Sequence, residues 1–163
     1  MAQVIIALGS NVGDRLTHMS RAKAFLASLS QRPVFASSIY ETEPVGEAST
    51  HYYYNAVCEI HIETEAQTFL KELKSYEREH GRDPDALRWA NRTIDLDIID
   101  FDHTPLEATS LILPHPEYPS RLFVLEPLKE LYPNWIDPVT GQSVSEMISK
   151  APKIEVYKTA LKW

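Results

Sequence analysis

Hydrophobic residues recur along this chain with two different periods, which predicts a protein of mixed helices and strands. Apolar residues spaced three and four apart indicate helices, which we expect over residues 14–29, 66–80, 121–131 and 143–149. Gly81 follows the second of these, where a left-handed cap is expected, and Ser120 precedes the third as its cap. Strict alternation or short apolar runs indicate strands, which we expect over residues 4–8, 34–40, 53–63, 93–101, 111–113 and 154–157.

The order of these elements favours one architecture. The first six run strand, helix, strand, strand, helix, strand, which is the split β-α-β arrangement. We therefore predict a ferredoxin-like βαββαβ sandwich of the α+β class, with an antiparallel sheet and C-terminal additions. An open parallel sheet is the weaker alternative, because no helix separates residues 34–40 from residues 53–63. The length of 163 residues, without a repeat or an interdomain linker, predicts a single domain over residues 1–163.

The last strand of this unit carries charges that point to metal and phosphate chemistry. Asp95 and Asp97 alternate with aliphatic residues, so their carboxylates share one face at a spacing of about 6.6 Å. Mg²⁺ favours a few carboxylate oxygens completed by water and phosphate. Arg88 and Arg92 lie just upstream, with Trp89 between them, and arginine suits phosphate. The stretch therefore indicates metal-assisted phosphoryl-type transfer, although a solvated strand face with charges of both signs would give the same pattern.

Charge and composition narrow the class of partner. The net charge of −7 argues against non-specific binding to nucleic acid or to an anionic membrane, so an anionic substrate needs a local basic site. The sequence has no apolar run of 18 residues and no leader pattern, so we expect a cytoplasmic protein. Cys58 is the single cysteine and lies on an apolar strand face, which predicts a buried, inert thiol. The histidines show no spacing typical of a zinc site. We expect a monomer or a weak homodimer.

Several short motifs fall in one order and spacing between residue 4 and about residue 131. An arginine, two residues and then Asp-apolar-Asp are present as Arg92 and Asp95-Leu96-Asp97. The other motifs are Gly9-Ser10-Asn11, residues 40–46 (Tyr-Glu-Thr-Glu-Pro-Val-Gly), Tyr53-x-Asn55-Ala56, Gly81-Arg82, Pro114-His115 and Arg121-x-Phe123. This set resembles the 6-hydroxymethyl-7,8-dihydropterin pyrophosphokinases of folate biosynthesis. The resemblance implies transfer of pyrophosphate from MgATP to 6-hydroxymethyl-7,8-dihydropterin, with release of AMP.

The resemblance also implies roles for individual residues. It places two Mg²⁺ ions on Asp95 and Asp97, where they would bridge the phosphates of ATP. The residues implied to steady the transferring phosphates are Arg82, Arg92, His115 and Arg121. The residues implied to contact ATP are Glu77, Arg88, Trp89 and Ile98. The residues implied to hold the pterin are Thr42, Val45, Tyr53, Asn55 and Phe123, with Tyr53 and Phe123 stacking on the ring. No residue is nominated as a general base.

Other interpretations of the same residues stay open. From sequence alone, Glu77 could be an exposed helix charge, Phe123 a core residue and His115 a structural or exposed histidine. The chain departs from the family pattern at Glu43, Pro84, Asn91 and Pro116. The rival functions are a two-metal nuclease or nucleotidyl transferase, and a pterin- or nucleotide-binding homologue with impaired catalysis. We also expect residues 82–91 to form a loop that closes over bound phosphates.

Overall fold

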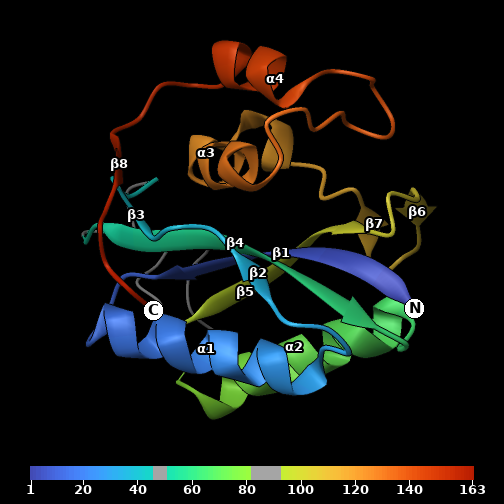
Figure 1. The fold of residues 1–163 in the computed structure, drawn as a ribbon, viewed down its shortest axis with the longest axis horizontal. Coiled ribbons are helices and arrows are strands. Elements are labelled where there is room, and N and C mark those ends of the chain that lie inside the picture. The colour runs from blue at the N-terminus through green and yellow to red at the C-terminus, as the bar shows by residue number, and fades with distance from the viewer. Residues whose placement is uncertain (46–50, 82–92) are drawn as a thin grey trace.

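The computed structural model describes residues 1–45, 51–81 and 93–163, and it places an antiparallel sheet between two helical layers (Figure 1). The strands of the main sheet are β1 (Ala2–Ser10), β2 (Phe35–Ala36), β3 (Tyr40–Thr42), β4 (Tyr53–Ile62), β5 (Asp95–Phe101) and β8 (Val156–Lys158). A separate two-stranded sheet is formed by β6 (Leu106–Glu107) and β7 (Ile112–Leu113). The helices are α1 (Arg15–Leu29), α2 (Ala66–Glu79), α3 (Leu122–Leu131) and α4 (Val144–Lys150).

The main sheet has the strand order β5-β1-β4-β3-β8, with β2 also paired to β4. The pairings of β1 with β4 and β5, and those of β4 with β2 and β3, are all antiparallel. The predicted α+β class with an antiparallel sheet is therefore confirmed, and the parallel alternative is wrong. None of the helices in the described ranges is long and apolar enough to cross a membrane.

The expected strand over residues 34–40 is two short strands, β2 and β3, because Ser37 interrupts the ladder. The Ser37 hydroxyl accepts a hydrogen bond from the Val57 N–H at 3.0 Å, where a strand carbonyl would otherwise accept it. The Ser37 carbonyl instead accepts from the indole N–H of Trp163 at 3.0 Å. The side chain thus replaces a backbone partner, and the backbone turns away from β4 before it pairs again.

Capping residues fix some of the helix ends, but α2 and α3 begin without a side-chain cap. The Asp14 carboxylate accepts from the Thr17 N–H at 3.1 Å and fixes the start of α1. Gly81 has a φ of +96° just after α2, so its predicted left-handed conformation is confirmed. The prediction that Ser120 caps α3 is wrong. Ser120 ends a short 3₁₀ turn and its hydroxyl donates to the Glu117 carbonyl at 3.0 Å, while Arg121 occupies the cap position without a side-chain capping bond to the helix.

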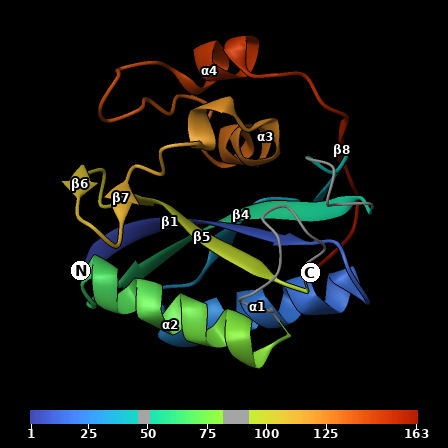
Figure 2. The same ribbon diagram turned by 180° about the vertical axis from the view of Figure 1, so that it is seen from behind.

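The two faces of the sheet belong to different cores. Helices α1 and α2 cover one face and α3 and α4 cover the other (Figures 1 and 2). Alternate residues of β1 divide between them, since Val4 and Ile6 pack toward α1 and α2 while Ile5 packs with α3. Cys58 is fully buried in the first core and burial raises its thiol pKa to about 12, as expected for an inert thiol.

Candidate active site

A cavity of about 400 Å³ lies on the α3 side of the sheet, over the ends of β1, β4 and β5. It gathers nine of the residues that the sequence nominated from separate parts of the chain. These are Thr42, Val45, Tyr53, Asn55, Asp95, Asp97, His115, Arg121 and Phe123. The volume falls within the range of ligand pockets for small molecules. Motifs up to 81 residues apart in sequence, Thr42 and Phe123 at the extremes, therefore converge on one site.

The register of three adjacent strands places these side chains. Gly9 of β1 lies opposite Asn55 of β4 and opposite Asp95 of β5. Residues directly across an antiparallel pair project to the same face, so Asn55 and Asp95 flank Gly9 on the cavity side. Asp97 follows in the next row, opposite Ala7. A Cβ atom on Gly9 would lie 2.8 Å from Asn55 Oδ1, so the glycine leaves the space that the Asn55 amide needs.

The pterin end predicted from the resemblance contains a buried polar pair. Thr42 and Asn55 are both buried, and Asn55 Nδ2 donates to Thr42 Oγ1 at 2.7 Å. A buried amide needs partners, and this bond fixes which edge of the amide faces the cavity. Phe123 lines the cavity beside the Arg121 guanidinium, which lies 5.6 Å from the ring centroid. The ring of Phe123 thus borders the cavity as well as the second core.

His115 and Arg121 form the part of the cavity suited to phosphate. The His115 N–H donates to the Ile99 carbonyl at 2.8 Å, which ties this loop to β5. The Glu117 N–H donates to His115 Nδ1 at 3.1 Å, so the ring proton resides on Nε2. Burial, with the nearby Arg121 charge, lowers the His115 pKa to about 4, so the imidazole is neutral at pH 7. A neutral ring held by its Nδ1 acceptor can donate from Nε2 to a phosphate oxygen.

The Arg121 guanidinium is largely buried, with 14% of its side chain exposed, and it forms an ion pair with Glu117. An arginine fork in such a position suits bidentate contact with phosphate oxygens. In the ligand-free protein the Glu117 carboxylate supplies the negative partner. A bound phosphate would therefore share or replace that contact.

A third carboxyl group, that of Glu77, lies beside Asp95 but outside the residues that line the cavity. Glu77 of α2 is fully buried, pairs with Lys74 Nζ at 3.0 Å and lies close to Asp95. Burial, opposed by the Lys74 charge and reinforced by the Asp95 charge, raises the Glu77 pKa to about 7. The interpretation of Glu77 as an exposed helix charge is therefore wrong.

The donor set fits hard divalent cations that the substrate helps to bind. Across the described ranges, no three His, Cys, Asp or Glu side chains are grouped so that they could hold a metal ion. Asp95 and Asp97 offer two carboxylates in a cavity that also presents Arg121 and His115 to phosphate. Mg²⁺ is commonly held by one or two carboxylates plus water and substrate phosphates, so this pair suffices when phosphate is bound.

Some of the nominated residues are not brought to this cavity by the described structure. Ile98 is 2% exposed and its side chain packs in the core with α1 and α2, so it does not line the cavity. Arg82, Arg88, Trp89 and Arg92 lie outside the described residues, as do Pro84 and Asn91 and the loop expected over residues 82–91. Predictions on these residues stay predictions.

Sequence reasoning missed two charged residues that line the cavity, Lys74 and Glu117. Each had a local signal, because Lys74 lies three residues before Glu77 on a helix and Glu117 lies four residues before Arg121. Glu43, noted only as a departure from the family pattern, also lines the cavity.

Known structures share this fold. The chain superimposes on a crystal structure of HPPK-DHPS in complex with substrates with a TM-score of 0.70 at 12% identity, covering 91% of this chain and 43% of that chain. Wild-type HPPK-DHPS of Plasmodium falciparum gives a TM-score of 0.67 at 14% identity, again covering 43% of that chain. This chain therefore spans less than half the length of those proteins, and at such identities the likeness concerns the fold.

Sequence comparisons identify the family. The chain is 42% identical over 127 residues to the 2-amino-4-hydroxy-6-hydroxymethyldihydropteridine pyrophosphokinase of Bacillus subtilis, covering 77% of this chain and 75% of that protein. It is 38% identical over 141 residues to the protein of the same name from Porphyromonas gingivalis, covering 85% and 95%. The sequence model described as 7,8-dihydro-6-hydroxymethylpterin-pyrophosphokinase (HPPK) matches residues 5–133. The resemblance seen in the motifs is confirmed, and the chain belongs to the 7,8-dihydro-6-hydroxymethylpterin pyrophosphokinase family.

Proposed function

We propose that this chain transfers pyrophosphate from MgATP to the hydroxymethyl group of 6-hydroxymethyl-7,8-dihydropterin, giving the pterin diphosphate and AMP. The observation that carries the proposal is the convergence of nine nominated residues on one cavity. The relatives from Bacillus subtilis and Porphyromonas gingivalis are named pyrophosphokinases. Asp95, Asp97, His115 and Arg121 are all present in the cavity, which favours an active enzyme over a binding protein with impaired catalysis.

The residues divide between orientation and charge. The Thr42–Asn55 pair would bond the edge of the pterin ring, with Tyr53, Val45 and Phe123 around the ring. This would aim the substrate hydroxyl along the sheet toward Asp95 and Asp97. The hydroxyl oxygen would form a bond to the β-phosphorus of ATP as the bond from that phosphorus to the oxygen shared with the α-phosphate breaks, and AMP leaves.

Arg121 and His115 would act on the transferring group. The guanidinium and the Nε2–H would donate to phosphate oxygens as negative charge redistributes. Asp95 and Asp97 would hold Mg²⁺, which supplies neutralisation of the phosphate charge when it is bound. That there are two ions, as the resemblance implies, is part of this proposal.

We also infer that β1, α1, β2 with β3, β4, α2 and β5 form a ferredoxin-like βαββαβ unit. The support is the antiparallel strand order β5-β1-β4-β3 and the position of α1 and α2 on one face. On this assignment α3, α4, β8 and the β6–β7 hairpin are additions, and α3 supplies one wall of the cavity. A monomer or weak homodimer in the cytoplasm, with two small-molecule partners and no nucleic acid, stays our expectation.

The test is a product assay with the full chain, 6-hydroxymethyl-7,8-dihydropterin, ATP and Mg²⁺. We expect AMP and the pterin diphosphate in equal amounts, and neither product without the pterin or with excess chelator. The matched control is Asp95→Asn with Asp97→Asn, which keeps side-chain size while removing both charges. Formation of ADP in place of AMP, or cleavage of nucleic acid by the same preparation, would refute the proposal.

A further inference from the structure

Residues 155–163, here called the C-terminal strap, run beside β3 at the edge of the main sheet, although the family model ends at residue 133. Within the strap, Glu155 contacts Glu43, which lines the cavity, and Tyr52, which directly precedes the cavity residue Tyr53. Its carbonyl accepts from the Glu43 N–H at 3.0 Å, and its own N–H donates to Glu43 Oε1 at 2.7 Å. Its carboxylate accepts from the Tyr52 hydroxyl, and this bond raises the Tyr52 pKa to about 12.

Glu43 and Tyr52 are each next in sequence to a residue that is nominated to hold the pterin. Glu43 directly follows Thr42, Tyr52 directly precedes Tyr53, and Thr42 lies opposite Tyr53 in the β3–β4 ladder. Glu155 therefore joins the ends of two strands just outside the pair that is nominated to hold the pterin. Glu155 makes this connection with its carboxylate, which bonds Tyr52, and with its backbone N–H and carbonyl, which both bond Glu43.

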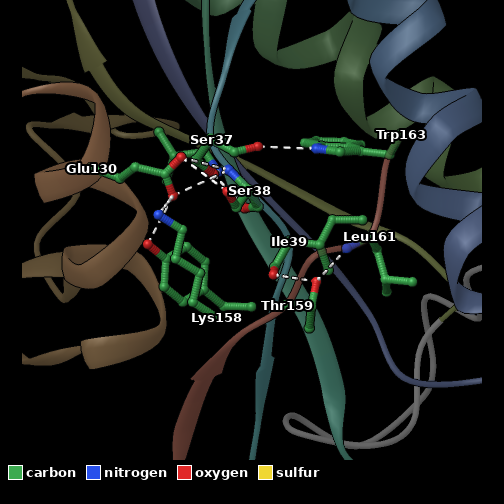
Figure 3. A network of polar contacts seen from close by, with 10 residues as sticks. Ser37, Ser38, Ile39, Glu130, Lys158, Thr159, Leu161 and Trp163 are labelled. Carbon is green, nitrogen blue, oxygen red and sulfur yellow. Dashed lines mark hydrogen bonds and ion pairs between the residues drawn. The ribbon is translucent and has the colours of Figure 1, made fainter.

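The rest of the strap holds β3 and the segment just before it, and Figure 3 shows the contacts of Thr159 with Ile39 and of Trp163 with Ser37. Strand β3 has only three residues, and β8 pairs with all three on the side away from β4. The Thr159 N–H and hydroxyl both donate to the Ile39 carbonyl, at 2.9 and 2.8 Å. Beyond it, the Trp163 indole donates to the Ser37 carbonyl. A strand this short gains order chiefly from its neighbours, so without the strap Thr42 would lie on a poorly held edge.

We propose that Glu155 is a positioning residue for the pterin substrate, which keeps the Thr42–Asn55 pair in place by joining Glu43 to Tyr52. The proposal rests on the proposed function for the identity of the ligand. Because it acts through the ring-binding residues, it affects affinity for the pterin and leaves the phosphate residues His115 and Arg121 unchanged. Glu155 itself is exposed and lies outside the residues that line the cavity.

The experiment compares Glu155→Ala, Glu155→Gln and Tyr52→Phe in the full chain. Binding of 6-hydroxymethyl-7,8-dihydropterin is measured by calorimetry with a non-hydrolysable MgATP analogue present, and KM and kcat by AMP release. We expect Glu155→Ala and Tyr52→Phe each to raise Kd and KM for the pterin about fivefold, the usual effect of one hydrogen bond, with kcat and ATP affinity within about twofold. The glutamine keeps an acceptor, so it should restore most of the affinity.

Two controls make the result specific. Lys158→Ala changes an exposed strap residue that pairs with Glu130 at 3.7 Å, and it should leave the pterin Kd unchanged. The double variant Tyr52→Phe/Glu155→Ala should bind no more weakly than the weaker single variant, since both remove one bond. Unchanged pterin affinity in Glu155→Ala, additive losses in the double variant, or equal losses in ATP affinity and kcat would overturn the proposal.

A measurement without substrate separates this inference from the proposed function. Glu155→Ala keeps the backbone carbonyl that accepts from the Glu43 amide but loses the carboxylate bond to Tyr52 that holds this segment in place. Hydrogen exchange of the Glu43 amide should therefore be faster in Glu155→Ala than in the parent or in Lys158→Ala. Exchange that is unchanged would overturn the positioning role even if the parent enzyme is active. Failure of the parent protein to form AMP would overturn the proposed function instead.

Discussion

Replacing Gly9 by alanine should weaken pterin binding while leaving the protein folded. Strand β1 is paired on both sides at this residue, to Asn55 and to Asp95, so its backbone cannot retreat. The new Cβ would lie 2.8 Å from Asn55 Oδ1, and the Asn55 side chain must therefore turn away. That movement breaks the 2.7 Å bond to Thr42. A buried polar group left without its partner costs about 1–3 kcal/mol, which corresponds to about 5- to 150-fold in the pterin Kd.

Calorimetric titration with the pterin and urea unfolding measure the two effects separately. The double variant Gly9→Ala/Asn55→Ala removes the clash, so it should unfold at the same urea concentration as Asn55→Ala alone, yet bind pterin no better than either single variant. The reasoning is refuted if Gly9→Ala binds pterin within twofold of the parent. It is also refuted if the double variant loses more unfolding free energy than Gly9→Ala and Asn55→Ala lose in sum.

Three further outcomes follow from the same site. Asp95→Asn and Asp97→Asn should each lower kcat/KM at least about 100-fold, because losing one electrostatic contact of this kind costs roughly 3 kcal/mol. The free energy of unfolding in urea, measured without Mg²⁺, should stay unchanged or rise. Near-parent turnover at saturating Mg²⁺ would contradict the prediction. The His115 pKa of about 4 lies below that of an unfolded histidine, so its contribution to the unfolding free energy is complete above about pH 6.5 and is lost as the pH falls through 4, by about 3 kcal/mol. Urea unfolding of the parent and of His115→Asn across this range measures it, and parallel profiles would exclude the assignment. Calorimetry should show that ATP binds weakly with excess chelator and tightly with Mg²⁺, because the chain carries a net charge of −7; equal affinities would contradict it.

The fold could be predicted well where burial imposes a period. Apolar residues alternate in β4 and β5 and recur at helical spacing in α1 and α2, because one side of each element packs in a core. Such a pattern can be recognised within a short stretch of sequence. The break at Ser37 was missed because it depends on bonds to Val57 and Trp163, far away in the chain. The strand expected over residues 111–113 contains β7, but the two-residue strand β6 is too short to show any period and was missed.

In the site, likewise, features that depend on neighbouring residues could be predicted, and features that depend on how distant segments pack could not. Asp95 and Asp97 could be placed on one face from their spacing alone, and the family motifs nominated most of the cavity residues. Lys74 and Glu117 were missed because their inclusion depends on how α2 and the segment before α3 lie against the sheet. Glu77 was left open for the same reason, since only the packed structure shows that its carboxyl is buried beside Asp95.

The division of each central strand between two faces has a consequence for how this protein tolerates mutation. At the cavity end of β1, Leu8 is buried in the core with α1 and α2, although it also borders the cavity, and its neighbours Ala7 and Gly9 line the cavity. In β5, Leu96 is buried in the same core between Asp95 and Asp97, which line the cavity. A saturation mutagenesis scan of these two segments should therefore show lost abundance at Leu8 and Leu96 and lost turnover at their neighbours. A single-residue deletion in either strand would exchange the two sets and lose both properties at once.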